Sequence, residues 1–230
     1  MKNWIIITLL LTLGFGANAG EFEEQLDHFT NIKAAGNFKV TLKKGEKEMA
    51  TIINEDANVD DDKIILEVEE DELSIRIKGD TYKERVLEIV IIYVELESVT
   101  SKLGCRLTID DSLSTDKIEF ISDSGGKIRA TVAAKKLFAT VSAGGSIHLD
   151  GAANTAYYKV KAGGTIGAVS VQADKVEATV KAGGEIICSV ENDLSIKITS
   201  GGSVSYFGDP EGYEQNITLG GKIHKMSKTK

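Results

Sequence analysis

Residues 142–147 read Ser-Ala-Gly-Gly-Ser-Ile, and this pattern of two glycines followed two places later by an aliphatic residue decides the fold. The pattern occurs six times along the chain, at nearly constant intervals. The pairs are Gly125-Gly126, Gly144-Gly145, Gly163-Gly164, Gly183-Gly184, Gly201-Gly202 and Gly220-Gly221. A fixed period of this length is typical of solenoids, in which each repeat buries its apolar face only by stacking on its neighbours.

The residues between the glycine pairs alternate as in half-buried strands. Leu137, Ala139 and Val141, for example, alternate with Phe138 and Thr140, and a period of two is the mark of a strand with one buried face. The aliphatic residues after the pairs form an inward column: Ile128, Ile147, Ile166, Ile186, Val204 and Ile223. The sequence therefore predicts an all-β chain, a parallel β-helix or β-solenoid with rungs of about 19 residues spaced about 4.8 Å apart.

Glycine is expected at each corner because it accepts positive φ and lets neighbouring backbones approach closely. Gly104-Cys105-Arg106-Leu107 fits the same frame, with cysteine in the place of the second glycine. Terminal repeats are commonly atypical, so this segment is predicted to open the series as a seventh, degenerate unit.

Residues 1–19 have the features of a secretory signal peptide. Lys2 precedes an apolar run from Trp4 to Phe15, and Ala17-Asn18-Ala19 supplies an A-x-A cleavage site. The run is too short for a comfortable membrane span, and no cysteine follows it for lipid attachment. We expect an exported protein, periplasmic, surface-exposed or released, with no transmembrane segment in the mature chain.

The remaining chain divides by composition into three parts. Residues 20–100 lack glycine pairs but contain strand-like runs, and are expected to form an N-terminal β region, either a cap or irregular rungs. The repeat solenoid occupies 101–224, and 225–230 form a polar tail. Strands are predicted in the N-terminal region at 38–41, 49–53, 63–69, 73–77 and 86–94.

Charge and composition argue against several classes of function. The formal net charge is −8, which argues against nucleic acid as a partner. The acidic runs at 60–62 and 67–72 lack an EF-hand frame, and a solvated face or turn explains them better than calcium. No metal site and no cofactor is expected.

The cysteines and histidines give no catalytic or metal constellation. Cys105 and Cys188 fall four rungs apart, about 19 Å, whereas disulfide-bonded Cα atoms lie within about 7 Å, so no intramolecular disulfide is predicted. His148 and His224 share an outward column but are also about 19 Å apart, and His28 lies elsewhere. No catalytic residues are assigned, although catalytic groups can also converge from loops.

One outward column could bind a ligand. Phe138 and Tyr157 occupy the same position on adjacent rungs and should stack, with Glu119 and Glu177 flanking them in the same column. An aromatic step between acids is a platform for a sugar ring or a protein partner. The alternative is a cross-strand pair that only stabilises the sheet.

Three groups of residues resemble one known family. They are the opening Phe29-Thr30-Asn31-Ile32-Lys33 with Gly36-Asn37-Phe38-Lys39-Val40, the middle Leu73-Ser74-Ile75, and the serial glycine pairs ending in Tyr206-Phe207-Gly208-Asp209-Pro210. Across nearly the whole mature chain the sequence resembles the putative auto-transporter adhesin, head GIN domain family. The resemblance implies a secreted right-handed β-helical protein of Bacteroidetes or other envelope-rich bacteria, and carries over no catalytic residues. The chain departs from the usual Ser-Gly-Ser-Gly repeat by using Ala-Gly-Gly and Ser-Gly-Gly.

These observations together predict a secreted, non-enzymatic envelope adhesin that offers a β-solenoid surface to a glycan or a cell-surface protein. A carbohydrate-active enzyme on a β-helix is one alternative. A structural envelope component that self-associates through an end or a flat face is another.

Overall fold

The computed structural model describes residues 21–54, 61–79 and 86–227, so the predicted signal peptide lies outside the described residues. Within these ranges 17 strands form one continuous sheet, and the remaining regular element is the short 3₁₀ helix η1 (Asp61–Lys63). The strands of the N-terminal region are β1 (Glu21–Gln25), β2 (Asn31–Ala35), β3 (Lys39–Lys44), β4 (Met49–Asn54), β5 (Ile64–Glu69), β6 (Glu72–Ile77), β7 (Leu87–Tyr93) and β8 (Ser98–Lys102). The strands of the repeats are β9 (Arg106–Asp123), β10 (Lys127–Val141), β11 (Ser146–Val160), β12 (Thr165–Ala182), β13 (Glu185–Ser189), β14 (Asp193–Ser200), β15 (Ser203–Phe207), β16 (Gly212–Leu219) and β17 (Lys222–Met226).

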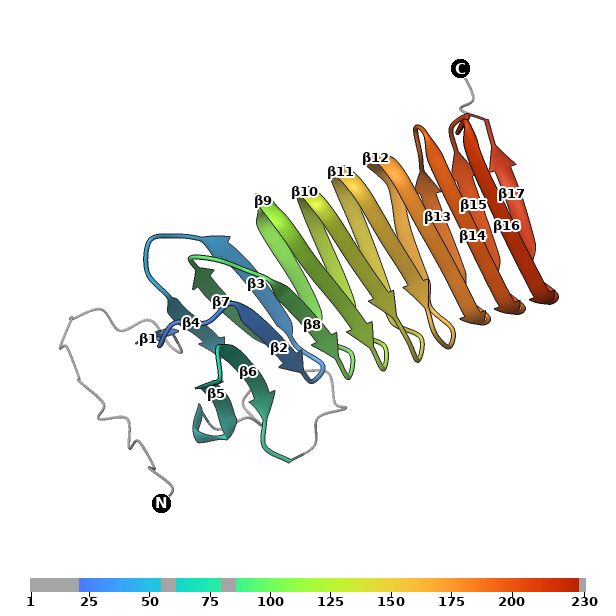
Figure 1. The fold of residues 1–230 in the computed structure, drawn as a ribbon. Helices are drawn as coiled ribbons and strands as arrows, with labels where there is room; N and C mark the ends of the chain where they lie inside the picture. The colour runs from blue at the N-terminus through green and yellow to red at the C-terminus, as the bar shows by residue number, and fades with distance from the viewer. Residues whose placement is uncertain (1–20, 55–60, 80–85, 228–230) are drawn as a thin grey trace.

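From β9 onward the strands stack in parallel at the period of the glycine pairs. Lys127 pairs with Ser146, and Ser146 pairs with Thr165, so each of these steps spans one glycine-pair repeat. Arg106 pairs with Lys127, which places Gly104-Cys105 at the start of the first such rung. The predicted β-solenoid, with one rung for each repeat of about 19 residues, is confirmed (Figure 1).

Each rung is flattened into two layers. In β10 every second residue from Ile128 to Ala134 is buried, Lys135 and Lys136 are both exposed, and the alternation then resumes from Leu137 to Val141. The two adjacent exposed residues mark a second corner, opposite the glycine pair. We call the segments that follow a glycine pair layer A and those that lead into the next pair layer B. Their apolar inner faces pack together as the core.

The corners at the glycine pairs show why both glycines are needed. Gly144 has φ of +76°, and a Cβ built there would meet no atom within 4 Å, so its requirement is conformational. Gly145 lacks a positive φ, but a Cβ would lie 2.6 Å from the Ser122 hydroxyl and 2.7 Å from the Ser122 carbonyl oxygen. In the later corners, such as Gly163-Gly164, both glycines have positive φ, so the turn is shifted by one residue.

Two buried serines complete the first corners of the stack. The Ser101 hydroxyl donates to the carbonyl of Cys105 at 2.8 Å, and the Ser122 hydroxyl donates to the carbonyl of Gly126. Ser122 Oγ also accepts the N–H of Ser146 at 3.1 Å. In the next rungs this inward column continues as Val141 and Val160, so the serine hydroxyls bond backbone groups at the first corners, and apolar side chains take their place in the later ones.

The N-terminal region is part of the same stack, but its rungs do not follow chain order. β2 lies between β6 and β8, and β3 lies between β7 and β9, all in parallel register. The rung formed by β2 and β3 is therefore held between β6 and β7 on one side and β8 and the start of β9 on the other. The five strands expected in this region are present, and β1, β2 and β8 are additional.

Antiparallel strands cover the N-terminal end of the stack. β4 pairs antiparallel with β7, β1 pairs with β4, and β5 pairs with β6. The N-terminal region thus contributes both irregular rungs and a cap, and the cap protects apolar strand edges that an open end would expose.

No helix among the described residues is long and apolar enough to cross a membrane.

Candidate binding face

The outer face of layer B carries the residues predicted to form a site. Phe138 pairs with Glu119 on one side and with Tyr157 on the other, and Tyr157 pairs with Glu177. The column Glu119, Phe138, Tyr157, Glu177 therefore exists as expected. The two rings stack with centroids 4.6 Å apart and an interplanar angle of 7°.

The stacking leaves only one ring face open to a ligand. Each ring covers one face of the other, and the Lys117 ammonium lies 5.6 Å from the Phe138 centroid, from the strand on the side away from Tyr157. Both faces of Phe138 are thus occupied. On its other side Tyr157 has Glu177 as its strand neighbour, and among the described residues no second ring or ammonium group stacks on that face.

Glu119 and Glu177 are too far apart for glycoside hydrolysis by a carboxylate pair. Three rung steps separate them, about 14 Å at the usual strand spacing. Hydrolases of this kind hold two carboxyl groups about 5 to 9.5 Å apart. The column can stack and hydrogen-bond a ligand, but these two acids do not form an acid and base pair across a scissile bond.

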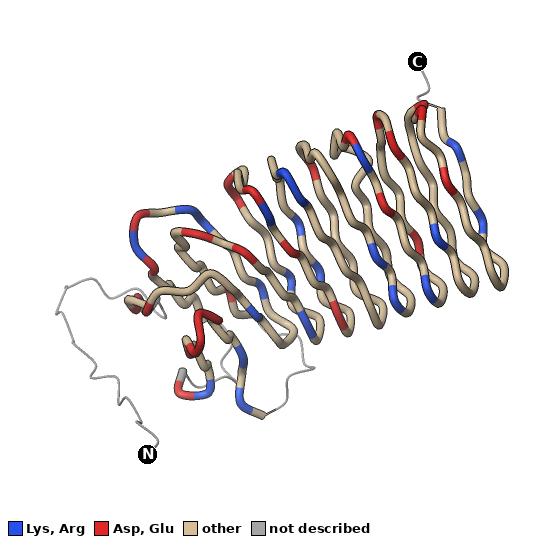
Figure 2. The backbone as a smooth tube through the Cα atoms, viewed as in Figure 1, with Lys and Arg blue, Asp and Glu red and all other residues tan. Residues whose placement is uncertain are grey.

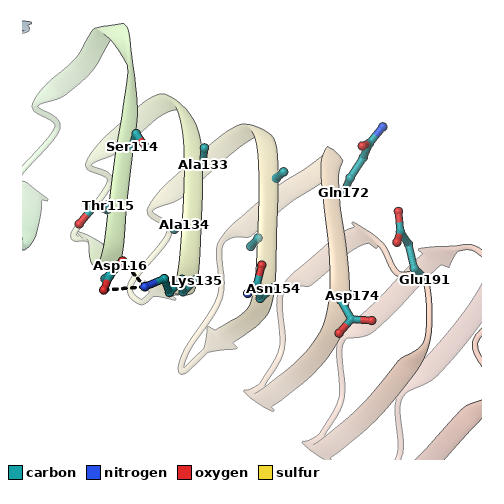
Figure 3. Close-up of a pocket in the computed structure, with 12 residues that line it drawn as sticks. Ser114, Thr115, Asp116, Ala133, Ala134, Lys135, Asn154, Gln172, Asp174 and Glu191 are labelled. Carbon is teal, nitrogen blue, oxygen red and sulfur yellow. Dashed lines mark hydrogen bonds and ion pairs between the residues drawn. The ribbon is translucent and has the colours of Figure 1, made fainter.

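A shallow groove of about 650 Å³, which sequence reasoning missed, follows the second corner across five rungs. Its floor consists of Ala133, Ala134, Ala152 and Ala153. Figure 3 shows Asp116, Lys135, Asn154 and Asp174 along one side of it, with Gln172 and Glu191 on the other. Small residues at the same position of successive rungs are the signal that could have located it.

Much of the polar rim of this groove is already satisfied by the protein. Lys135 Nζ lies 2.8 Å from Asp116 Oδ1, and Asn192 Nδ2 donates to Asp174 Oδ1. These groups link neighbouring rungs along the corner. The groove thus combines an alanine floor with a rim whose acids partly pair with neighbouring rungs.

The histidines are separated in the structure as they are in the sequence. His148 pairs with Gly167, and the same column continues through Ile187 and Ser205 to His224. His28 lies in the N-terminal region, where Glu48 hydrogen-bonds it at 2.7 Å and raises its pKa. Among the described residues no group of three or more His, Cys, Asp or Glu side chains is arranged to hold a metal ion.

Both cysteines are free and buried. Burial raises the pKa of Cys105 and of Cys188 to about 12, so both thiols stay protonated at neutral pH and behave as small apolar residues. Neither is placed to act as a nucleophile.

The acidic residues of the N-terminal region surround a polar hollow of about 460 Å³ that includes Glu67, Glu69, Glu70 and Glu72. Arg76 pairs with Glu67 at 3.3 Å, and Lys33 pairs with Glu72 at 3.4 Å. Residues 67–72 thus line a surface hollow with local ion pairs, and Asp60 of the other acidic run lies outside the described residues.

Comparisons with known proteins agree with this architecture. Residues 28–210 match the family described as "Putative auto-transporter adhesin, head GIN domain". The structure is similar to that of a putative adhesin from Bacteroides fragilis (TM-score 0.75, 20% identity), covering 89% of this chain and 94% of that one. It is also similar to a putative adhesin from Parabacteroides merdae (TM-score 0.73, 16% identity, 91% and 98% covered). A putative lipid binding protein from Parabacteroides distasonis gives a TM-score of 0.70 at 22% identity, with 91% and 98% covered. No curated protein matches the sequence.

Proposed function

Because the chain belongs to the putative auto-transporter adhesin, head GIN domain family, we propose that it is an exported, non-enzymatic protein of the bacterial envelope that binds a glycan or a cell-surface protein. The observation that carries the proposal is the Phe138–Tyr157 stack on the outer face of layer B, with one face of Tyr157 left open. Aromatic rings that present an apolar face beside a polar tip are typical contact residues of binding surfaces.

The scaffold favours binding over catalysis. The face is a regular parallel sheet whose side chains are held at the spacing of the rungs, with the ring pair standing in a single column. Such a surface is rigid and broad, and it suits an extended ligand laid along the stack. Export is supported by the signal-peptide features of residues 1–19 and by the adhesin description of the family.

The test is a binding screen with matched variants. The mature chain, from Gly20 onward, is applied to an array of bacterial and host glycans and matrix proteins beside the Tyr157→Ala and Phe138→Ala variants. We expect selective binding that Tyr157→Ala reduces about tenfold or more and that Phe138→Ala reduces less, since truncation of an aromatic contact costs about 1 to 3 kcal/mol.

Tyr213→Ala is the control, because Tyr213 is an exposed aromatic residue (43%) on β16, away from the stack. It should bind as the wild type does. If both Tyr157→Ala and Phe138→Ala bound the ligand as the wild type does, the ring pair would not be part of the binding site. Absence of binding by the wild type to every class on the array would contradict the adhesin function.

A second function, self-association in the envelope, is favoured by the C-terminal end of the stack. Within the described part of the chain β16 and β17 each have a parallel neighbour on one side only, β14 and β15 respectively. Leu219 is 71% exposed there, and Ile217, Tyr213 and Met226 are also exposed. Unpaired strand edges beside apolar side chains are where β proteins associate.

Sedimentation over a range of protein concentrations tests this second function. Self-association through the end predicts a mass that rises with concentration and a Leu219→Lys variant that stays monomeric, because a charge at the edge opposes pairing. A wild-type mass that is monomeric at every concentration would rule it out.

A further inference from the structure

Layer B presents a dense set of lysines around the ring pair. Its outward residues are those that alternate with buried ones, so the side chains lie on one face. We call this set the lysine face. Three of its members lie at the corner where layer B begins, and four lie along the layer: Lys117, Lys136 and Lys175, then Lys159, Lys161, Lys181 and Lys197. Figure 2 shows basic residues recurring from rung to rung along the solenoid.

The lysine face is positive within an acidic protein. In β9 to β14 the same outward positions carry four carboxylates, Glu119, Asp123, Glu177 and Asp193, against the seven lysines, and Glu214 of β16 adds a fifth. Two of the acids have lysine partners, Asp193 with Lys175 at 2.8 Å and Asp123 with Lys102 at 3.9 Å. An excess of positive charge on one face of a chain whose formal net charge is −8 sets this surface apart.

The arrangement of the lysines opposes stability. Lys117 and Lys136 pair directly across β9 and β10, and Lys161 and Lys181 directly follow the paired Val160 and Val180 of β11 and β12. Like charges opposite each other on neighbouring strands destabilise a sheet. A sheet that needed only to fold would gain by placing opposite charges at these positions, so the pattern is better explained by an acidic partner.

Over part of two columns, lysines also recur at every second rung. In one column Thr155 lies between Lys136 and Lys175, and in another Thr179 lies between Lys159 and Lys197. Lysines two rungs apart in a column are separated by about 10 Å at the usual strand spacing. The two lysine columns flank the column of Tyr157, so hydroxyl groups, ammonium groups and an open ring face lie together on one surface.

We propose that the lysine face binds an extended acidic polysaccharide, whose carboxylate or sulfate groups meet the lysines while a sugar ring lies against Tyr157. The inference rests on the proposed function and names its ligand class. Alternating hydroxyl and ammonium donors match a chain of sugars that bear hydroxyls on every unit and acids at intervals. A flat, periodic face accommodates a polymer rather than a small molecule.

Two other polyanions fit this face less well. Nucleic-acid recognition favours arginine and aromatic faces open to bases, whereas the outward positions of layer B in β9 to β14 carry no arginine and Phe138 is covered on both faces. An anionic membrane surface favours apolar side chains projecting among the basic ones. In β9 to β14 the outward residues of layer B are mostly lysine, threonine, serine and acids around one stacked pair, and the one aliphatic residue among them, Ile121, is half-buried.

Calorimetric titration with polygalacturonate and alginate oligomers, at low and high ionic strength, tests the proposal on the mature chain. We expect binding that weakens at high salt and that falls about tenfold in the Lys136→Gln/Lys159→Gln variant, since each exposed charge interaction contributes up to about 1 kcal/mol. Lys127→Gln/Lys222→Gln, which removes two lysines from layer A, is the matched control and should bind as the wild type does.

Further binding measurements distinguish a failure of the acidic ligand from a failure of the adhesin function. A neutral glucan bound as tightly as polygalacturonate, and released by Tyr157→Ala, would leave the adhesin function standing and overturn the acidic ligand. Acidic oligomers bound equally by the Lys136→Gln/Lys159→Gln variant would also overturn it. If double-stranded DNA or phosphatidylglycerol vesicles bound more tightly than polygalacturonate, the proposed ligand would be a nucleic acid or a membrane surface and not a polysaccharide. Binding of the acidic oligomers that depends on the lysines but not on Tyr157 would support the ligand class and remove the ring from the site.

Discussion

At the scale of single residues, the two glycines of one corner are required for different physical reasons. Gly144 needs a positive φ but has space around it, whereas Gly145 has ordinary φ but lies against the backbone of Ser122. Gly144→Ala should therefore lower the free energy of unfolding by about 1 kcal/mol, the cost of alanine in a left-handed conformation. Gly145→Ala should lower it by about 3 kcal/mol, because backbone must move.

Urea denaturation of the two variants checks this ordering. Both proteins should retain the β spectrum of the wild type, and the midpoint of Gly145→Ala should be the lower one. Equal losses of unfolding free energy, or a greater loss in Gly144→Ala, would mean that Gly145 is not required because of the limited space around it.

The buried cysteines predict a loss of stability in alkali. An unfolded cysteine loses its proton near pH 9, whereas burial raises the pKa of Cys105 and Cys188 to about 12. Above pH 9 the unfolded chain releases protons that the native state keeps, so the free energy of unfolding falls as pH rises, by about 1.4 kcal/mol per pH unit for each cysteine. Below pH 9 the thiols make no contribution.

Urea midpoints between pH 8 and 11 measure this effect when compared with a Cys105→Ala/Cys188→Ala variant. The variant should start less stable, because it loses buried volume, but its midpoint should fall less steeply with pH. Tyr93, whose pKa burial raises to about 12, contributes alike to both proteins. Parallel pH profiles would show that the thiols ionise in the native state.

At the scale of elements, the contact between β10 and β11 includes a stabilising part that is independent of any ligand. Stacked aromatic pairs contribute about 0.5 to 1.5 kcal/mol beyond their buried area. A double-mutant cycle with Phe138→Ala and Tyr157→Ala, measured by urea denaturation without ligand, should give a coupling of about 1 kcal/mol. Additive losses would mean that the pair does not stabilise the sheet, and would leave binding as its sole role.

The sequence predicted this pair because both rings stand at the same distance from their glycine pairs, so strand register alone brings them together. It did not predict that Lys117 lies over Phe138, because Lys117 pairs with Lys136 and reaches the ring diagonally. The position of a residue in a column does not determine the direction in which its side chain points. The excess of lysine in layer B was not predicted either, because it becomes apparent only when the outward positions of all rungs are known.

The second corner was also within reach of the sequence, although no glycine or proline marks it. The alternation of buried and exposed residues in β10 is interrupted at Lys135 and Lys136, which are both exposed. Such an interruption of the two-residue period is expected where a strand bends from one layer into the other. No pattern in the sequence indicated the order of the N-terminal rungs. It depends on pairing between strands far apart in the chain, as in Lys39 with Arg106, which local patterns do not encode.

At the scale of the whole molecule, the insertion of residues 31–44 between two later rungs predicts where the stack opens last. Strands β2 and β3 have parallel neighbours on both sides, so their amides exchange only when several rungs separate. Hydrogen exchange followed by mass spectrometry should find β3 as protected as β10 and β11, and β17 the least protected of the solenoid strands. Fast exchange in β3 would show that the N-terminal rungs open independently of the rest.

The same insertion has a consequence for how such a chain can change in length over evolution. Between β10 and β12 each rung pairs only with its neighbours in chain order, so duplicating one glycine-pair repeat in frame would lengthen the molecule by one strand spacing and leave the strand pairing of the other rungs in place. The same duplication among β2, β3, β6 and β7 would separate strands that must interleave with later rungs. Growth by tandem duplication is therefore open to the repeat half alone, while the N-terminal half must be inherited as a unit.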